Sequence, residues 1–420
     1  MKITLTQFRP NTAEAVWTDC FAQAIAELHK AGGGVLTVPT GEYSTGPIEL
    51  CSNMELHLEP GAVIRFLNDP AAFPLQECQY EGRISHRPKP CLSAFNAENV
   101  ALTGSGVLDG CGAPWWAAQR ARTLANGRPY LLHFENVTHL RVCGVQLRNS
   151  PAWTVHPLNC VDVLIEDVSI CNPYNSPNTD GINPESCRDV RILGCRVDVG
   201  DDCITLKSGT EETPSPAPCE NIVIANCLLV HGHGGIVIGS EMSGGVRNVT
   251  VTNCVFTGTD RGLRVKTRRR RGGCVENLRL SNLVMERVFC PFVFNMYYSC
   301  GTAEKDRWVW EKTPYPVDGG TPAFRNIRIN GVTVVGATAS AGFFYGLAES
   351  PIDGLSLTDC HIEMARGAAP EKPAMMGNLE PMSARGFFLR NAKNVEFHNV
   401  TLKNADGEAY DTDESVDGEF

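Results

Sequence analysis

A pattern of alternating hydrophobic and polar residues recurs along most of the chain. Each unit reads apolar, x, apolar, x, x, apolar, x, apolar, and starts 23 to 49 residues after the one before it. Alternation with a period of two over so few residues predicts short β-strands, and the two-residue break predicts a bend between them. The ten units begin at Val100, Leu140, Val163, Val190, Ile222, Val249, Leu278, Ile327, Leu355 and Val395.

Short strands and turns at this spacing predict an all-β solenoid. We expect a right-handed parallel β-helix of about ten turns, with turn-forming residues such as Asn99 and Asp162 directly before the repeat units. Residues 13–31 have a helical pattern that ends at Gly32-Gly33-Gly34, so a helix is expected to cap the amino-terminal end. The prediction is a single β-helix domain over residues 1–403.

Composition and charge narrow the possible functions. The 420 residues are 43% hydrophobic and 20% charged, which is typical of a globular protein with a large core. No apolar run approaches the roughly 18 residues of a membrane span, and the net charge of −10 argues against nucleic-acid binding. Seven of the acidic residues follow Lys403 without a basic residue among them, which predicts an acidic, mobile tail over residues 404–420.

The cysteines and the first residues of the chain suggest a location. Eighteen cysteines would indicate disulfides in a secreted protein, but the first ten residues contain no apolar signal segment. We therefore interpret the cysteines as small buried side chains and expect a cytoplasmic protein, or a secreted one if a signal was removed. No CxxC pair supports a zinc site. The sequence does not indicate an oligomeric state.

Four consecutive turns carry chemically active side chains in matching positions. Stacked turns lie about 4.8 Å apart, so residues in matching positions should meet on one wall. Carboxylates held this close raise the pKa of at least one of them, and a pair with separated pKa values suits acid/base hydrolysis. Aligned on Ile182, Ile204, Ile236 and Leu263, the turns match Asp180 with Asp202, Asp201 with His233 and Asp260, and Lys207 with Lys266.

Basic residues follow the acidic ones. Arg264 and Lys266 are two positions apart on one predicted strand, so they point to the same face and suit a substrate that carries carboxylates. Asp260 alone is interpreted as a turn residue. The run Arg268–Arg271 is expected to be a solvated loop, with a basic rim that attracts a polyanion as the alternative.

Four ordered motifs carry a family resemblance. Asn178-Thr179-Asp180, Gly200-Asp201-Asp202, Gly232-His233-Gly234 and Arg264-Val265-Lys266 resemble the motifs of glycoside hydrolase family 28, the polygalacturonases, and the likeness covers roughly residues 15–400. The resemblance implies a β-helix enzyme that cleaves α-1,4-galacturonosidic bonds of pectin with inversion and needs no metal or cofactor. It implies the following roles: Asp201 as general acid, Asp180 and Asp202 as the pair that activates water, His233 as the residue that tunes Asp201, and Asn178, Arg264, Lys266 and Tyr298 (or alternatively Tyr297) as substrate-binding residues.

Two expectations follow for the reaction. An inverting hydrolase keeps its acid and base about 6.5–9.5 Å apart, so we expect Asp201 to be offset from Asp180. We expect exo action, because a cytoplasmic enzyme meets oligomers and because insertions at about 66–98 and 111–135 could close one end of the cleft. The expected partner is an acidic galacturonate-containing oligosaccharide or polysaccharide, with no nucleic acid and no membrane.

Three other functions are compatible with the same pattern. A rhamnogalacturonan or other pectin-backbone hydrolase of the same family is the nearest. A pectate lyase would share the fold and the acidic substrate, but it would need a Ca²⁺ site and an Arg or Lys base. A non-catalytic, carbohydrate-binding β-solenoid would show no turnover and would tolerate Asp201→Asn without loss of binding.

Overall fold

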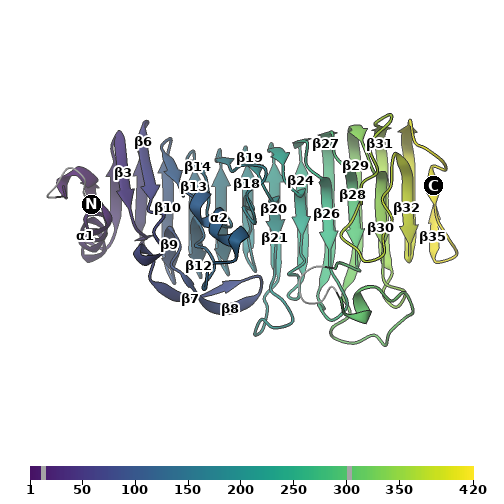
Figure 1. Ribbon diagram of the computed structural model, residues 1–420, viewed down its shortest axis with the longest axis horizontal. Helices are drawn as coiled ribbons and strands as arrows, with labels where there is room; N and C mark the ends of the chain where they lie inside the picture. Colours follow the sequence, from purple (N-terminus) through teal and green to yellow (C-terminus); the bar gives the residue numbers. More distant parts are fainter. Residues whose placement is uncertain (11–15, 300–304) are drawn as a thin grey trace. The chain divides into compact units, whose positions relative to one another are not determined.

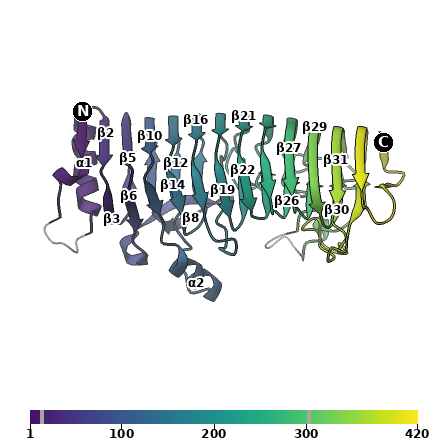
Figure 2. The same cartoon turned by 90° about the horizontal axis from the view of Figure 1, so that it is seen from above.

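The computed structural model describes residues 1–10, 16–299 and 305–420. It divides into two compact units, residues 1–201 and 202–420, and each consists of parallel strands stacked coil upon coil (Figures 1 and 2). This is the parallel β-helix that the repeat predicts. The prediction that residues 1–403 act as one domain stays a prediction.

Unit 1 contains two parallel sheets. In the first sheet, β10 (Glu98–Gly104), β13 (Thr138–Cys143), β16 (Val161–Glu166) and β18 (Arg188–Leu193) carry the first halves of the repeat units. The remaining strands of that sheet are β1 (Lys2–Thr4), β2 (Gly34–Val38), β3 (Gly41–Thr45), β5 (Met54–Leu58), β6 (Ala62–Phe66), β11 (Val107–Asp109), β14 (Gln146–Arg148), β17 (Ser169–Cys171) and β19 (Arg196–Val199). The second sheet consists of β4 (Ile48–Glu49), β9 (Leu92–Phe95), β12 (Leu132–Glu135) and β15 (Val155–Leu158).

The first residues of the repeat units pair in register in unit 1. Val100 lies opposite Leu140, Leu140 opposite Val163, and Val163 opposite Val190, and all four side chains are fully buried. Each such side chain contributes roughly 1.5–3 kcal/mol on burial, and a shift by one residue would turn the whole set to solvent. The coils β2–β3 and β5–β6 precede the first repeat unit, so the stack begins earlier than the repeat alone indicates.

Helix α1 (Thr18–Lys30) confirms the predicted cap (Figure 2). Its apolar face buries Cys20, Phe21, Ala24, Ile25 and Leu28, and it contacts β2. The helix ends where the backbone N–H of Gly33 donates to the carbonyl oxygen of Leu28 at 2.8 Å, as a glycine stop requires. The part of the predicted helix at residues 13–15 lies outside the described residues.

The two predicted insertions of unit 1 have structure of their own. The first contains the 3-10 turn Pro70–Ala72 and an antiparallel hairpin of β7 (Leu75–Tyr80) and β8 (Arg83–Pro88), which we call the β7–β8 hairpin (Figure 1). The second contains α2 (Ala113–Ala121). Trp115 of α2 contacts Phe73 of the first insertion edge to face, with ring centroids 5.7 Å apart.

Unit 2 repeats the same architecture. The first sheet contains β21 (Cys219–Ala225), β22 (Leu228–His231), β24 (Val246–Thr252), β25 (Val255–Thr257), β27 (Cys274–Glu286), β29 (Ala323–Ala337), β31 (Ile352–Met364), β33 (Ala392–Lys403) and β35 (Val416–Glu419). The second sheet contains β20 (Asp202–Leu206), β23 (Gly234–Ile238), β26 (Arg261–Lys266), β28 (Cys290–Asn295), β30 (Ser340–Tyr345), β32 (Arg385–Arg390) and β34 (Tyr410–Asp411). A 3-10 turn spans Arg307–Val309.

The repeat also holds its register in unit 2. The first residues pair in order from Ile222 through Val249, Leu278, Ile327 and Leu355 to Val395. The residues directly before them form a ladder of side-chain amides, in which Asn248 donates to Asn221 at 3.0 Å, Asn277 to Asn248 at 3.0 Å, and Asn326 to Asn277 at 2.6 Å. All four asparagines have positive φ, which this residue type tolerates, so the predicted turn role is confirmed.

The carboxyl-terminal segment, residues 404–420, contains two short strands, and its mobility stays a prediction. Strand β34 pairs with β32 and β35 pairs with β33, so the segment continues both sheets. Its two aromatic residues provide the reason, because the rings of Tyr410 and Phe420 lie 4.9 Å apart and both pack on Phe397. The acidic residues between them remain on the surface.

Two further observations concern the chain as a whole. Within the described residues, no helix is long and apolar enough to cross a membrane. All 17 cysteines in the described part of the chain are free thiols, and most are buried in the coils, as the sequence predicts. Cys300 lies outside the described residues.

Candidate active site

Asp180 lies on the coil that follows β15 in unit 1. Its backbone carbonyl accepts from the N–H of Thr154 at 2.8 Å, and Ile182 forms a parallel bridge with Val155. The Asp180 side chain is only 4% exposed, and Nδ2 of Asn183 donates to its Oδ2 at 3.1 Å. A buried carboxylate with a fixed amide donor is held in one orientation, as a positioned acid or base must be.

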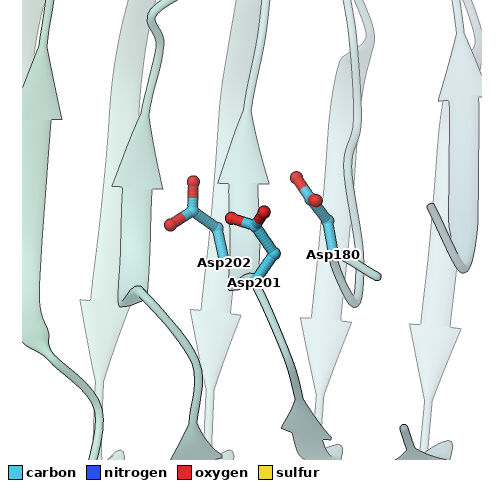
Figure 3. Close-up of side chains that lie close together, drawn as sticks. All are labelled: Asp180, Asp201 and Asp202. Atoms are coloured by element: carbon cyan, nitrogen blue, oxygen red, sulfur yellow. The ribbon is translucent and has the colours of Figure 1, made fainter. Parts of the chain in front are cut away.

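Asp201 is the last residue of unit 1 and is partly exposed. One of its carboxylate oxygens lies within 4.8 Å of one oxygen of Asp180, and Asp202, the next residue in the chain, completes the group of carboxylates in Figure 3. This distance joins single oxygens and not whole carboxyl groups, so the offset of Asp201 from Asp180 expected from the sequence stays a prediction.

Asp202 begins β20 in unit 2 and is 2% exposed. Its Oδ1 accepts from Nη1 of Arg264 at 3.0 Å and its Oδ2 from Nζ of Lys266 at 2.8 Å. Burial alone would raise the pKa of Asp202, but Lys266, Arg264 and, more weakly, Lys207 lower it well below the ordinary value. Asp202 is therefore a carboxylate that stays ionised.

The alignment of turns predicted from the sequence is confirmed within unit 2. Ile204 lies opposite Ile236, and Ile236 opposite Leu263, as the shared apolar position requires. Asp202 lies opposite Gly234, where a Cβ atom would come within 3.2 Å of Oδ1 of Asp202 and 2.5 Å of the Val237 side chain. A glycine at this position keeps the space around the carboxylate open.

His233 is the most exposed of the predicted catalytic residues, with 54% of its side chain accessible. Its Nδ1 lies 2.8 Å from Oδ2 of Asp260, and that oxygen also accepts from Nη1 of Arg261 at 3.2 Å. The interpretation of Asp260 as a turn residue alone is wrong. It orients the imidazole, and the matched positions of His233 and Asp260 were the sequence signal for this contact.

The structure distinguishes the two candidate tyrosines. The ring of Tyr298 faces Arg264 and Lys266, whose charged atoms lie 5.9 and 5.4 Å from its centroid, and the residue is partly exposed. Tyr297 is fully buried and packs against Nζ of Lys312 instead. Only Tyr298 contacts the predicted substrate-binding cations.

Asn178 is held by an arginine that the sequence did not indicate. Arg128, 2% exposed, donates to Oδ1 of Asn178 at 2.7 Å and to the carbonyl oxygens of Pro177 at 2.5 Å and Pro151 at 2.9 Å. Burial lowers the pKa of Arg128, which is partly offset by Tyr80 and Asp180. No local pattern around Arg128 marks it, because it lies in an insertion outside the repeat.

A second unforeseen contact comes from the loop before β32. Nη2 of Arg264 lies 3.1 Å from the sulfur of Met375, and Nδ2 of Asn295 donates to the Met375 carbonyl at 3.0 Å. Arg261 donates to the carbonyl oxygens of Lys372 and Pro373 at 2.8 and 3.0 Å. The loop thus contacts and orients Arg261 and Arg264, the two arginines of β26.

The arginine run is neither a solvated loop nor an open basic rim. Arg269 is 4% exposed and binds Glu349 through two N–H groups at 2.5 and 2.9 Å. Arg268 and Arg271 both bind Glu211 at 2.5 Å, and only Arg270 is exposed, over the ring of Trp308. Both sequence interpretations of Arg268–Arg271 are therefore corrected, because acidic residues from distant loops neutralise most of the run.

The group of carboxylates also has the chemistry of a cation site. Oxygen donors at this spacing suit hard cations such as Ca²⁺. Both oxygens of Asp202 are already bound by Arg264 and Lys266, however, so these side chains occupy the place of a counter-ion. The residues present fit a mechanism that uses protein cations.

The fold and these side chains define a carbohydrate-active enzyme of the β-helix class, with carboxylates for acid/base chemistry beside an arginine and a lysine. Residues 36–367 match the family described as Glycosyl hydrolases family 28. The chain belongs to this family and is a glycoside hydrolase with a right-handed parallel β-helix.

Three relatives illustrate the likeness. The chain is 30% identical over 363 residues to a probable polygalacturonase of Vitis vinifera, covering 84% of this chain and 72% of the relative. The crystal structure of an exopolygalacturonase from Thermotoga maritima matches with a TM-score of 0.74 and 29% identity, over 96% of this chain and 92% of that one. A family 28 exopolygalacturonase of Yersinia enterocolitica shares the fold, with a TM-score of 0.79 and 20% identity over 99% and 78% of the two chains.

Proposed function

We propose that the protein hydrolyses α-1,4-galacturonosidic bonds in oligogalacturonates derived from pectin, by acid/base catalysis with inversion, and that it acts from a chain end. The observation that carries the proposal is the buried Asp202, kept ionised by Lys266 and Arg264. The partly exposed Asp201 stands next to it in the chain. Adjacent carboxyl groups in such different environments suit the two opposite proton transfers of a hydrolysis.

The proposed roles follow from these environments. Asp201 protonates the leaving oxygen, because it is the carboxyl group with access to solvent. Asp180 and Asp202 remove a proton from the attacking water. His233, oriented by Asp260, tunes Asp201. Arg264, Lys266 and Tyr298 hold a galacturonate carboxylate, because the two cations lie together beside Asp202 and face the Tyr298 ring.

Inversion is proposed from the partners that hold the carboxylates. A retaining mechanism needs a carboxylate whose oxygen attacks the sugar directly. Both oxygens of Asp202 are bound by cationic side chains, and Oδ2 of Asp180 is bound by Asn183. Because these oxygens are engaged, we assign them to positioning and activating water rather than to direct attack on the sugar.

Exo action is supported by the β7–β8 hairpin, which packs on unit 1 at Glu185, five residues after Asp180 in the chain. Gln79 donates to Oε1 of Glu185 at 2.6 Å, and the hydroxyl of Tyr130 donates to the carbonyl of Gln79 at 2.6 Å. Under this cover His133, His156 and Glu185 are fully buried. A polysaccharide bound along this part of unit 1 would meet the hairpin, so the end of the sugar chain would lie there.

The products formed from hexagalacturonate test the proposal. We expect one short product to accumulate from the first minutes while the other chains shorten stepwise, whereas a random mixture of sizes would contradict exo action. Hydrolysis predicts no absorbance in the near ultraviolet and full activity with EDTA, and a lyase predicts the opposite on both counts. Parallel digests of rhamnogalacturonan oligomers test the other pectin-backbone substrate, and faster turnover of these would overturn the substrate assignment.

A further inference from the structure

We propose that Arg87, on the β7–β8 hairpin, binds the carboxylate of the terminal galacturonate and so makes the enzyme specific for a chain end that carries a charge. This inference rests on the proposed function and adds a substrate-binding residue outside the four sequence motifs. Arg87 lies on β8, in an insertion that interrupts the repeat.

A stack of aromatic rings connects Arg87 to Asp180. The guanidinium carbon of Arg87 lies 3.8 Å from the centroid of the Tyr80 ring, and Tyr80 stacks on Trp153 with centroids 4.8 Å apart at 26°. The residue after Trp153 is Thr154, whose N–H binds the backbone carbonyl of Asp180. The hairpin therefore places a planar cation on the same part of unit 1 as a catalytic carboxylate.

The electrostatics agree with this placement. Burial raises the pKa of Tyr80, Glu81 and Asp180 raise it further, and Arg128 and Arg87 oppose the rise. Asp180 and Arg87 thus both lie close enough to the Tyr80 hydroxyl to act on its charge. In the described part of the chain no hydrogen bond is found for that hydroxyl.

Arg87 keeps most of its hydrogen-bonding capacity. Its Nη2 donates to the carbonyl oxygen of Arg128 at 3.1 Å, and no carboxylate among the described residues pairs with it. The nearby Glu185 is already bound by Gln79 and His156. A guanidinium has five N–H donors in a plane that matches a carboxylate, so a ligand carboxylate suits the remaining ones.

The backbone next to Arg87 leaves room for the guanidinium. Gly127 has φ of +74°, and a Cβ atom at this position would lie 2.8 Å from both terminal nitrogens of Arg87. The hairpin itself does not depend on Arg87 for its attachment, because Gln79 and Tyr130 hold it. Arg87 is thus a partly buried cation that the Tyr80 ring and the Arg128 carbonyl hold in place, in the insertion that approaches Asp180 through Tyr80 and Trp153.

The test measures discrimination between charged and neutral chain ends. Trigalacturonates are prepared with a methyl ester on the sugar at one end or at the other, and kcat/KM is measured for each with wild type, Arg87→Met and Arg87→Lys. For wild type we expect esterification at one of the two ends to lower kcat/KM about 10- to 100-fold, as loss of a charge-assisted hydrogen bond does. Arg87→Met should lose most of this discrimination by a rise in KM for the free acid, and Arg87→Lys should retain part of it.

The outcomes separate the two proposals. If Arg87→Met still hydrolyses trigalacturonate but discriminates as well as wild type, Arg87 has only a structural role and the inference is overturned, while the proposed function stands. If wild type releases no reducing ends from trigalacturonate, the proposed function itself fails. Arg279→Met is the matched control, because Arg279 also donates to backbone carbonyls but lies on β27 of unit 2, so this change should leave discrimination unchanged.

Discussion

Lys266 donates from Nζ to Oδ2 of Asp202 at 2.8 Å, and both side chains are almost completely buried. The two residues are 64 positions apart in the sequence but lie on parallel strands, β20 and β26, that have β23 between them. Because a buried charge is costly without a partner, this pair explains why an ionised carboxylate persists in the wall of the coil.

Replacement of Asp202 should destabilise the protein in a pH-dependent way. Since the pKa of Asp202 is lowered in the folded state, its contribution is present above the ordinary carboxyl pKa of about 3.9 and is lost as pH falls toward the folded value. Asp202→Asn should cost about 3–5 kcal/mol at pH 7, because two buried cations lose their partner, and clearly less at pH 3. Denaturant titrations at both pH values measure this. An equal cost at the two values would contradict the ionised state, and Asp411→Asn, which breaks an exposed pair with Arg390, should cost at most about 1 kcal/mol.

Asp201→Asn should abolish most of the activity without unfolding the chain. A general acid contributes roughly 10²- to 10⁴-fold to the rate, and the amide cannot donate the proton. Reducing-end release gives kcat, and circular dichroism with a thermal melt monitors the fold. Activity within about tenfold of wild type would show that Asp201 is not the acid. Asp162→Asn, an exposed change on β16, serves as the control.

Tyr298 and Tyr297 should respond differently to substitution. Tyr298→Ala removes the ring that orients Arg264 and Lys266, so these cations should hold the substrate carboxylate less well and KM should rise roughly 3- to 30-fold, or about 0.5–2 kcal/mol of binding free energy. Tyr297→Phe changes a buried ring away from these cations and should leave KM unchanged. Steady-state kinetics on trigalacturonate decide the assignment, and the reverse pattern would favour Tyr297.

Lys312 should make stability rise with pH in the alkaline range. Burial and, to a lesser extent, Arg269 lower the pKa of Lys312 to about 7. Between that value and the unfolded value of about 10.4 the unfolded chain binds a proton that the folded chain does not, so stability increases with pH. Lys312→Met should keep the packing on the Tyr297 ring and remove this increase. Thermal melts between pH 7 and 10 measure it, and an unchanged slope would contradict the lowered pKa.

The sequence predicted the parts of the fold that repeat. Val249 and Leu278 could be aligned by pattern, and they lie opposite each other, because identical coils must place equivalent residues in register. The same reasoning matched Ile204 with Ile236 and His233 with Asp260. Where the functional side chains lie on the repeat, the spacing of residues in the sequence was sufficient to predict which of them meet.

The segments between the coils could not be predicted in this way. Arg128, Arg87 and Met375 reach their partners from insertions, and no repeat fixes where an insertion folds back. Arg269 was predicted to be solvated because it lies in a run of arginines. It binds Glu349 instead, which is 80 residues away in the sequence.

The anomeric form of the first product tests the central claim most directly. Proton NMR during the first minutes of trigalacturonate hydrolysis distinguishes the α- and β-forms of the newly made reducing end before they equilibrate. Water activated by Asp180 and Asp202 attacks the face opposite the leaving group, so the α-linkage should yield the β-anomer first. Initial release of the α-anomer would show a covalent intermediate on one of the carboxylates, and it would contradict the mechanism.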